Sequence, residues 1–506
     1  MTPPGHPLRV LPRRPHAPVL RSLASFLTPR TPLLASLLLL GACASSPAAD
    51  PEDPSPLSRL AGESWMSVWL RDERAGWARS ELRTGRWRGR DVWILASESH
   101  LRFRHRGRPL DFDGADRTGY ERRPPFRFLF HESEIRTGGS LVKTSIEPEG
   151  RAFRVVIRRG RGVEERRARF GHTLEDALAP ELLALSRPRP GQRLETVLFL
   201  PECAEEEAGR IEVAGGEGDR PGAEAVRLRV RGEKTDRRIL LTVEGVRLET
   251  QLGPGMVLRR EPAGRRAARR GGGADLSALS LTPPIDEPLG LAPSDVVRMV
   301  AELEGLDPAA LPSGARQTVV PLGPERARVT VVRDPPPGRG AGEEPLPRYL
   351  ASTARMPLHD EALRSAAARA CGGATDPLEK ARRIAGWVHR NLQKTGRIQL
   401  PSAADVLACG KGDCTEHALL CAAMCRAASV PARVATGLVY VGDERKRFGL
   451  HAWVEAWADR WRALDPALGE AAADATHIKL VEGLGALDLA RIAGAIRVRV
   501  LEAEGE

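Results

Sequence analysis

The sequence predicts an α+β fold, with an N-terminal antiparallel β-rich domain and a C-terminal domain in which helices pack on an antiparallel sheet. Segments between residues 64 and 260 alternate apolar and polar side chains, as half-buried strands do. The last third of the sequence instead carries a helix start signal followed by apolar residues at helical spacing. A protein of 506 residues is also too long for one hydrophobic core, so about two or three domains are expected.

The expected strands of the N-terminal region are separated by Gly, Pro and Asp turns. The clearest is VRLRVR (226–231), with valine and leucine on one face and arginine on the other. One helix is expected at TLEDALAPELLALSR (173–187), so the sheet should curve around a helix. This region shows no cluster of catalytic residue types, and a binding or spacer role is the default prediction for it.

Changes in composition divide the sequence into six segments. Proline and alanine enrich a tether, and arginine and glycine enrich a later linker. The predicted segments are a signal peptide (1–42), the tether (43–58), the β-rich domain (59–258), the linker (259–290), a small β-containing segment (291–348) and the helix-containing C-terminal domain (349–506).

The basic charge of the protein does not predict a nucleic-acid partner. The formal net charge is +11, but only seven of the 77 basic residues are lysines. An arginine-, alanine-, glycine- and proline-rich composition is typical of a GC-rich genome, so codon usage accounts for most of the excess. The basic linker (259–290) is accordingly interpreted as a solvated segment, and no nucleic acid is expected to bind.

The N-terminus resembles a bacterial lipoprotein signal. An arginine-rich stretch without acidic residues precedes the apolar run PLLASLLLLGA, which is too short to span a bilayer by itself. The run ends in Leu-Gly-Ala-Cys43, which resembles a lipobox, and the resemblance implies that Cys43 is lipidated and becomes the mature N-terminus. Ala44 follows it instead of Asp, which favours the outer membrane, facing the periplasm. A plain secretion signal with a chance cysteine is the alternative.

The stretch DPLEKARRIAGWVHRNL (376–392) predicts the start of a helix. Asp376 is a plausible N-cap, Pro377 suits the first helical position and Glu379 would complete a capping box. Ile384 and Val388 then follow helical spacing on one face. This helix leads into a stretch that is unusually rich in cysteine.

In GKGDCTEHALLCAAMC (410–425), Cys414 is predicted to lie in the first turn of a helix, because glycines precede it and strong helix formers follow. Unpaired backbone N–H groups and the helix dipole stabilise a thiolate at that position. Cys421 and Cys425 fall on the same helix face. Alanines share this stripe, so both cysteines are predicted to pack as small apolar residues.

Two other interpretations of these cysteines compete with the nucleophile. Zinc sites usually use closely paired ligands, whereas Cys414 and Cys421 would lie about 10 Å apart along a helix at 1.5 Å per residue. No metal and no cofactor is therefore predicted. A disulfide between Cys409 and Cys414 would be possible in an oxidising compartment and would block a nucleophile. Cys203 and Cys371 could pair or stay free.

A reactive thiol needs a base, and FGLHAWVEAWADRWRALDPAL (448–468) supplies a candidate. His451 lies on an expected strand, and a turn near residues 458–460 brings Asp465 diagonally across from it on the next strand. A carboxylate there can hold the imidazole in one tautomer and stabilise its protonated form. The other ring nitrogen is then left to take the proton of Cys414.

These stretches resemble the transglutaminase-like superfamily, which has a papain-like fold and the chain order Cys, His, Asp. The resemblance covers about residues 378–480 and consists of GKGDCTEHA, RAASVPARVATGLVY, HAWVEAW and the ALDPA turn. It implies that Cys414 is the nucleophile, His451 the general base and then acid, and Asp465 the residue that orients it. The backbone N–H of Cys414 and a second donor would bind the oxyanion, with Gln399 as a candidate for that donor.

The predicted function is thiol-dependent acyl transfer or amide hydrolysis, through a thioester, on a protein or peptide substrate of the cell envelope. The sequence does not distinguish water from an amine as the group that resolves the thioester. A catalytically idle module that uses the same fold to bind a partner is the main alternative, and it predicts ordinary thiol reactivity. A metal- or redox-binding cysteine protein is a third possibility, which predicts stoichiometric zinc.

Overall fold

The computed structural model describes most of the residues that follow the predicted tether. The predicted signal peptide, Cys43 and Gln399 lie outside the described residues. Among the described helices, none is both long and apolar enough to cross a bilayer. The described residues are 56–70, 73–105, 108–137, 139–201, 203–214, 225–232, 235–252, 256–261, 274–275, 283–335, 347–395, 401–483 and 496–506.

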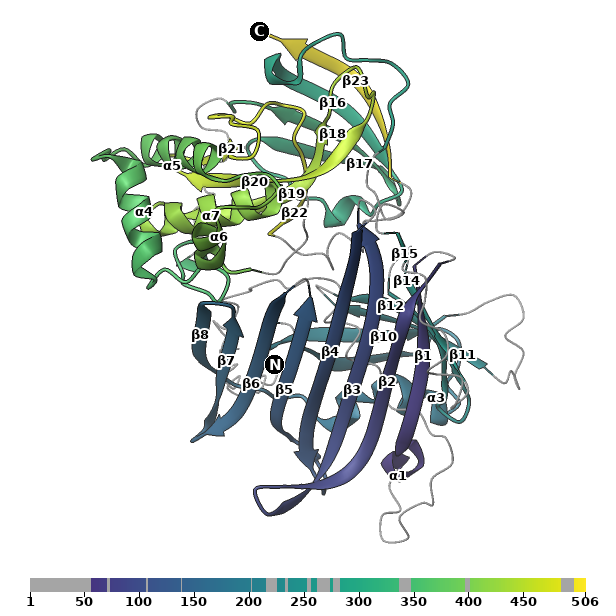
Figure 1. Ribbon diagram of the computed structural model, residues 1–506. Helices are drawn as coiled ribbons and strands as arrows, with labels where there is room; N and C mark the ends of the chain where they lie inside the picture. The colour runs from purple at the N-terminus through teal and green to yellow at the C-terminus, as the bar shows by residue number, and fades with distance from the viewer. Residues whose placement is uncertain are drawn as a thin grey trace, which may run out of the picture.

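The N-terminal half is one strongly curved sheet of 15 strands (Figure 1). Its strands run in the order β8-β7-β6-β5-β4-β3-β2-β1-β14-β13-β12-β11-β10-β9 with antiparallel neighbours, and β15 adds a short parallel pairing to β3. The bounds are β1 (Gly62–Leu70), β2 (Glu73–Trp87), β3 (Arg90–His105), β4 (Arg108–Glu121), β5 (Phe128–Thr137), β6 (Ser140–Glu149), β7 (Ala152–Arg159), β8 (Gly162–Ala168), β9 (Arg193–Leu200), β10 (Glu205–Val213), β11 (Ala225–Gly232), β12 (Asp236–Thr242), β13 (Arg247–Gln251), β14 (Met256–Arg260) and β15 (Ala274–Asp275).

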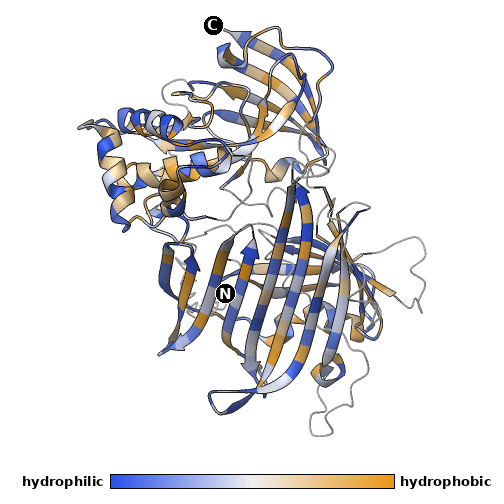
Figure 2. Cartoon of the chain, viewed as in Figure 1, coloured by the Kyte–Doolittle hydropathy of each residue, from blue (hydrophilic) through white to orange (hydrophobic). Residues whose placement is uncertain are grey.

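Alternation of side chains builds this sheet, as the sequence predicted. In β11, Val226, Leu228 and Val230 are buried, and the arginines between them are not. Figure 2 shows hydrophobic and hydrophilic bands alternating along the strands. The β-rich N-terminal region and the mixed α+β class are therefore confirmed.

The single helix expected at residues 173–187 is two short helices, α2 (Leu174–Ala177) and α3 (Ala179–Leu185). Thr173 caps α2, and Pro180 lies in the first turn of α3, where its missing N–H costs no helical hydrogen bond. α3 packs against β10–β12 in one apolar cluster, so the sheet does curve around helical structure. A further short helix, α1 (Pro56–Leu60), precedes β1.

The C-terminal region packs four helices on a small antiparallel sheet. The sheet has the order β21-β20-β19-β22, and one apolar cluster lies between it and the helices. The elements are α4 (Glu361–Cys371), α5 (Pro377–Asn391), α6 (Ala403–Cys409), α7 (Cys414–Ala427), β19 (Ala432–Tyr440), β20 (Phe448–Trp457), β21 (Trp461–Leu464) and β22 (Ile478–Glu482).

The start of α5 is largely as predicted. The Asp376 side chain accepts a hydrogen bond from the Glu379 backbone N–H at 2.8 Å, and Pro377 is the first helical residue. The predicted capping box is wrong, however. The Glu379 carboxylate instead accepts a hydrogen bond from Arg383, one turn further along, at 2.7 Å.

A second four-stranded sheet joins two parts that the sequence treated as separate. Its order is β17-β18-β16-β23, so the segment 291–348 pairs with the last strand of the predicted domain 349–506. Ile285, from the predicted linker, is buried in the same core, and β14 extends through Arg260 into that linker. The elements are β16 (Val296–Glu304), β17 (Gln317–Gly323), β18 (Arg326–Val332), β23 (Arg497–Gly505) and the 3₁₀ turns Pro293–Asp295, Pro308–Ala310 and Pro347–Tyr349.

The hairpin β7–β8 connects the large sheet to the helices. Arg161 lies in the turn of this hairpin, and its backbone N–H donates to the Asp405 carboxylate at the start of α6. The backbone N–H of Ala354 donates to Glu164 at 3.2 Å, and Ala354 itself is buried in the core of the N-terminal sheet. The large sheet therefore contacts the helix that leads to the Cys414 loop (Figure 1).

We expect the buried ion pair between Glu181 on α3 and Arg247 on β13 to be important for the stability of the N-terminal half. The two side chains are 2.6 Å apart and at most 5% exposed. Glu181→Ala should lower the free energy of unfolding by about 3–5 kcal/mol, because it removes one member of a buried ion pair. Urea denaturation followed by circular dichroism measures this loss. Glu165→Ala, which breaks an exposed pair with Arg154, should cost less than about 1 kcal/mol, and equal losses in the two variants would contradict the prediction.

Candidate active site

Cys414 is the first residue of α7 and is half-buried at the edge of the helix–sheet core. The backbone N–H of Asp413 donates to the Glu416 carboxylate at 2.9 Å, which fixes the first turn. Glycine is required at two positions before the helix for steric reasons. Gly410 has a φ of +63°, and a Cβ on Gly412 would lie 2.2 Å from the Glu416 side chain. The sequence thus places a thiol at a helix N-terminus, as predicted.

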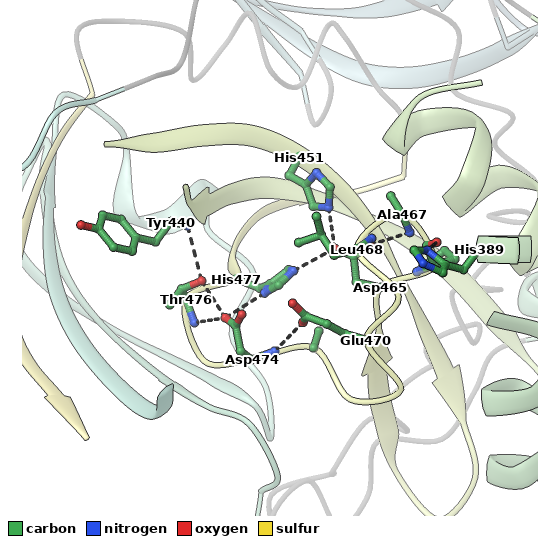
Figure 3. Close-up of polar contacts among 12 residues, drawn as sticks. His389, Tyr440, His451, Asp465, Ala467, Leu468, Glu470, Asp474, Thr476 and His477 are labelled. Atoms are coloured by element: carbon green, nitrogen blue, oxygen red, sulfur yellow. Dashed lines mark hydrogen bonds and ion pairs between the residues drawn. The ribbon is translucent and has the colours of Figure 1, made fainter. Parts of the chain in front are cut away.

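His451 and Asp465 meet across the β20–β21 hairpin. Val454 on β20 is paired with Leu464 on β21, and this register brings Asp465 diagonally toward His451. His451 Nε2 and Asp465 Oδ2 are 2.5 Å apart (Figure 3). His451 is 9% exposed and Asp465 is fully buried, so their hydrogen bond is shielded from solvent.

The environment favours a protonated His451. Burial alone lowers the pKa of His451, but hydrogen bonds and charge interactions with Asp465 and Cys414 outweigh it and raise the pKa to about 10. Burial opposes ionisation of Asp465 as well, yet its hydrogen bonds to His451 and His477 hold its pKa far below the usual range. Since Nε2 of His451 faces Asp465, Nδ1 is left for the Cys414 thiol. The structure thus brings the three predicted residues together.

Asp465 has partners that the sequence did not predict. Its Oδ1 accepts the backbone N–H groups of Ala467 and Leu468 at 2.8 and 2.9 Å. Its Oδ2 lies 3.1 Å from Nε2 of His477, a fully buried residue one position before β22. Nothing local in the sequence marks His477, because its approach to Asp465 depends on the pairing of β22 with β19.

The donor atoms of this cluster are close enough together to suggest a metal ion. Those of His451, Asp465 and His477 lie within 4.8 Å of one another, as do those of Glu470, Asp474 and His477. In the first group, the hydrogen bonds among the three side chains already account for the spacing. The spacing of these three side chains therefore does not require a metal ion.

None of the cysteines among the described residues forms a disulfide. Cys421 and Cys425 are fully buried in the helix–sheet core, as expected for packing residues. Hydrogen bonding between Cys421 and Cys425, together with burial, holds the pKa of Cys421 well above its ordinary value. Cys371 is buried in this core too, whereas Cys409 is exposed at the end of α6. Cys203 is buried in the N-terminal half.

Residues 393–395 run beside the Cys414 loop. The backbone N–H of Gln393 donates to Gly410, and that of Gly412 donates back to Gln393, both at 3.0 Å. The backbone N–H of Thr395 donates to the Asp413 carboxylate at 3.1 Å. The predicted second oxyanion donor, Gln399, follows this segment but lies outside the described residues.

A cysteine at a helix start, facing a histidine–aspartate pair on the adjacent sheet, is the arrangement of a thiol-dependent hydrolase or acyltransferase. A comparison with protein families matches residues 364–466 to the transglutaminase-like superfamily. These residues therefore form a transglutaminase-like core, and they include Cys414, His451 and Asp465. The match supports a peptidase- or acyltransferase-type function in general. A comparison with curated proteins found no match.

Three of the solved structures that resemble this protein have TM-scores below 0.3. One, from Cytophaga hutchinsonii, is provisionally named a cysteine protease; it has 16% identity and a TM-score of 0.27, over 42% of this protein and 90% of that one. A β-barrel-like protein of a domain of unknown function from Brucella abortus has 11% identity and a TM-score of 0.28, over 39% and 94%. A provisionally named protease from Parabacteroides distasonis has 14% identity and a TM-score of 0.18, over 64% of each protein. At such TM-scores none of them carries an argument about function.

The raised pKa of His451 predicts a pH-dependent contribution to stability. A histidine whose folded pKa is about 10 stabilises the folded state fully below the unfolded pKa of about 6.5, and this contribution is lost as pH rises through 10. The wild-type protein should therefore exceed His451→Gln in unfolding free energy by about 3–5 kcal/mol at pH 6. The difference should shrink steadily between pH 7 and 10 in urea titrations. A difference that stays constant over that interval would show that His451 is not protonated in the folded protein.

Proposed function

We propose that the C-terminal region catalyses thiol-dependent acyl transfer or amide hydrolysis on a protein or peptide, through a thioester on Cys414. The observation that supports this most directly is the contact of a helix-start thiol with a buried imidazole that is 2.5 Å from a buried carboxylate. A binding module has no need of this arrangement, because burying an imidazole and a carboxylate together costs free energy.

In the first step, the Cys414 sulfur attacks a carboxamide or peptide carbonyl carbon and forms the S–C bond. The proton on His451 passes to the nitrogen of the leaving group, so that the C–N bond breaks and ammonia or an amine departs. The backbone N–H of Cys414, at the start of α7, can donate to the oxyanion that forms in between. Asp465 keeps the imidazole oriented through both proton transfers.

In the second step, water or an amine attacks the thioester carbonyl. His451 takes the proton of the attacking group, and the Cys414 thiolate leaves as the S–C bond breaks. Water gives hydrolysis and an amine gives a new amide, with the same three residues. Which one wins depends on how far the bound substrate excludes water from the thioester.

The proposed substrates are proteins or peptides of the cell envelope. This rests on the predicted signal peptide and on the proposed lipidation of Cys43, which would tether the domain to the outer membrane. The idle binding module remains the competing proposal, and it differs in requiring no turnover.

The experiment uses a glutamine-containing dipeptide with a blocked N-terminus as the carboxamide probe. With hydroxylamine as acceptor, acyl transfer yields a hydroxamate, and without it hydrolysis releases ammonia. We expect one or both products from the wild-type protein, and a loss of at least about 10³-fold in Cys414→Ala, because nucleophile and base act as a unit. A parallel incubation with a mixed peptide library, read by mass spectrometry for new termini, tests cleavage of peptide bonds.

His451→Ala should lose the same activity, and Cys421→Ala is the matched control, because it removes a buried thiol from the same helix without touching the imidazole. Similar product yields from wild type and Cys414→Ala would rule out a thioester on this residue. No product from either probe, together with an unreactive Cys414, would favour the binding module.

A further inference from the structure

The fully buried His477 lies between two carboxylates. Its Nε2 is 3.1 Å from Asp465 Oδ2, and its Nδ1 is 3.1 Å from Asp474 Oδ1 (Figure 3). A neutral imidazole carries only one N–H, so a ring that faces carboxylate oxygens on both sides satisfies both only when it is doubly protonated. Burial opposes that charge, but the two aspartates outweigh it and raise the pKa of His477.

The charges from His451 to Asp474 alternate in sign. The sulfur of Cys414 is followed by the imidazolium of His451, the carboxylate of Asp465, the imidazolium of His477 and the carboxylate of Asp474. Each buried charge in the series has opposite charges as its neighbours, which is the condition under which buried ions are tolerated.

The position of His477 is fixed from several sides. Asp474 Oδ1 also accepts the backbone N–H and the hydroxyl of Thr476 at 2.7 and 2.6 Å. Arg316, in the bend just before β17, is 7% exposed and donates to the backbone carbonyls of Asp474 and His477. The Trp453 ring stands edge-on to the imidazole, with the centroids 5.2 Å apart.

His477 also affects the proton on His451. The two rings have centroids 5.9 Å apart and share one oxygen of Asp465. A positive charge at that distance opposes a second one, so His477 limits how strongly the carboxylate retains the His451 proton. A base that must return its proton to a leaving amine benefits from this limit. Besides these aspartates, the charged groups near His477 are Glu470 and Arg316.

We propose that His477, held by Asp474, is a positioning residue of the active site: it fixes the Asp465 carboxylate and opposes, with its own charge, the retention of the His451 proton. This inference rests on the proposed function, since it assigns His477 a part in the same reaction. It extends the three predicted residues to a series of five.

The first test follows alkylation of Cys414 by iodoacetate from pH 5 to 11. This anionic reagent prefers a thiolate beside an imidazolium, so its rate falls when His451 loses its proton. His477→Gln keeps an amide donor for Asp465 but cannot carry charge. We expect the pH at which the iodoacetate rate falls to be about one unit higher in His477→Gln than in the wild-type protein. Alkylation at pH 6–7 by neutral iodoacetamide should stay within about threefold of wild type, while turnover of the glutamine probe drops about tenfold.

His131→Gln is the matched control, because His131 is fully buried in the N-terminal sheet and faces the Thr118 hydroxyl instead of a carboxylate. Its iodoacetate profile should coincide with wild type. A His477→Gln profile that also coincides with wild type, or that moves to lower pH, would overturn the inference. If wild-type Cys414 reacts no faster than the exposed Cys409, the proposed function fails instead, so the two failures are distinguishable.

A second test does not depend on the folding of a variant at His477. Nitrogen-15 spectra of the histidine-labelled full-length protein should show the rings of His451 and His477 doubly protonated between pH 6 and 8. The His451 signals are those that vanish in His451→Ala, and the His477 ring is assigned through its contact with the Trp453 ring. A ring beside Trp453 that carries only one N–H proton in this pH range would overturn the proposal.

Discussion

The hydrogen bond between His451 and Asp465 is the interaction on which the rest of the active site depends. Both groups are buried and each offsets the charge of the other, while His477 and two backbone N–H groups further stabilise the Asp465 carboxylate. The β20–β21 hairpin sets their separation through its register, and the core between α7 and the sheet brings Cys414 to the free side of the imidazole. A change in that packing alters the distance between the Cys414 sulfur and the His451 imidazole, and this distance decides whether the thiol has a base.

Parts of the protein outside the matched core support this pair. Arg316, which directly precedes β17 of the second sheet, donates to backbone carbonyls around His477 and so holds the far end of the polar network. From the other side, Ala354 is buried in the core of the large sheet, and the next residue, Arg355, interacts with Glu416 in the first turn of α7. Burial lowers the pKa of Arg355 to about 10 although the charge of Glu416 opposes this. The N-terminal half thus interacts, through Ala354 and Arg355, with the helix that carries the nucleophile.

The sequence predicted those features of the active site that depend on residues close together in the sequence. Cys414 follows from glycines and helix formers within a few residues, and the His451–Asp465 contact from a hairpin in which a short turn fixes the register. His477 and Arg316 could not be found in this way. The hydrogen bond between them joins residues 161 positions apart, and the approach of His477 to Asp465 depends on the pairing of β22 with β19. The pairing of β16 with β23 was missed for the same reason, since no local pattern records a partner some 200 residues away. The break between α2 and α3, by contrast, was visible in Pro180.

The central claim is that His451 activates the Cys414 thiol as a nucleophile, and the rate of its alkylation by iodoacetamide tests this most directly. Mass spectrometry would follow each cysteine of the purified protein at pH 6–7, with the exposed Cys409 as an internal reference. We predict that Cys414 reacts at least about tenfold faster than Cys409, although it is less exposed, and that this advantage disappears in His451→Ala. Equal rates for the two cysteines, or a fast Cys414 that is indifferent to the loss of His451, would contradict the account.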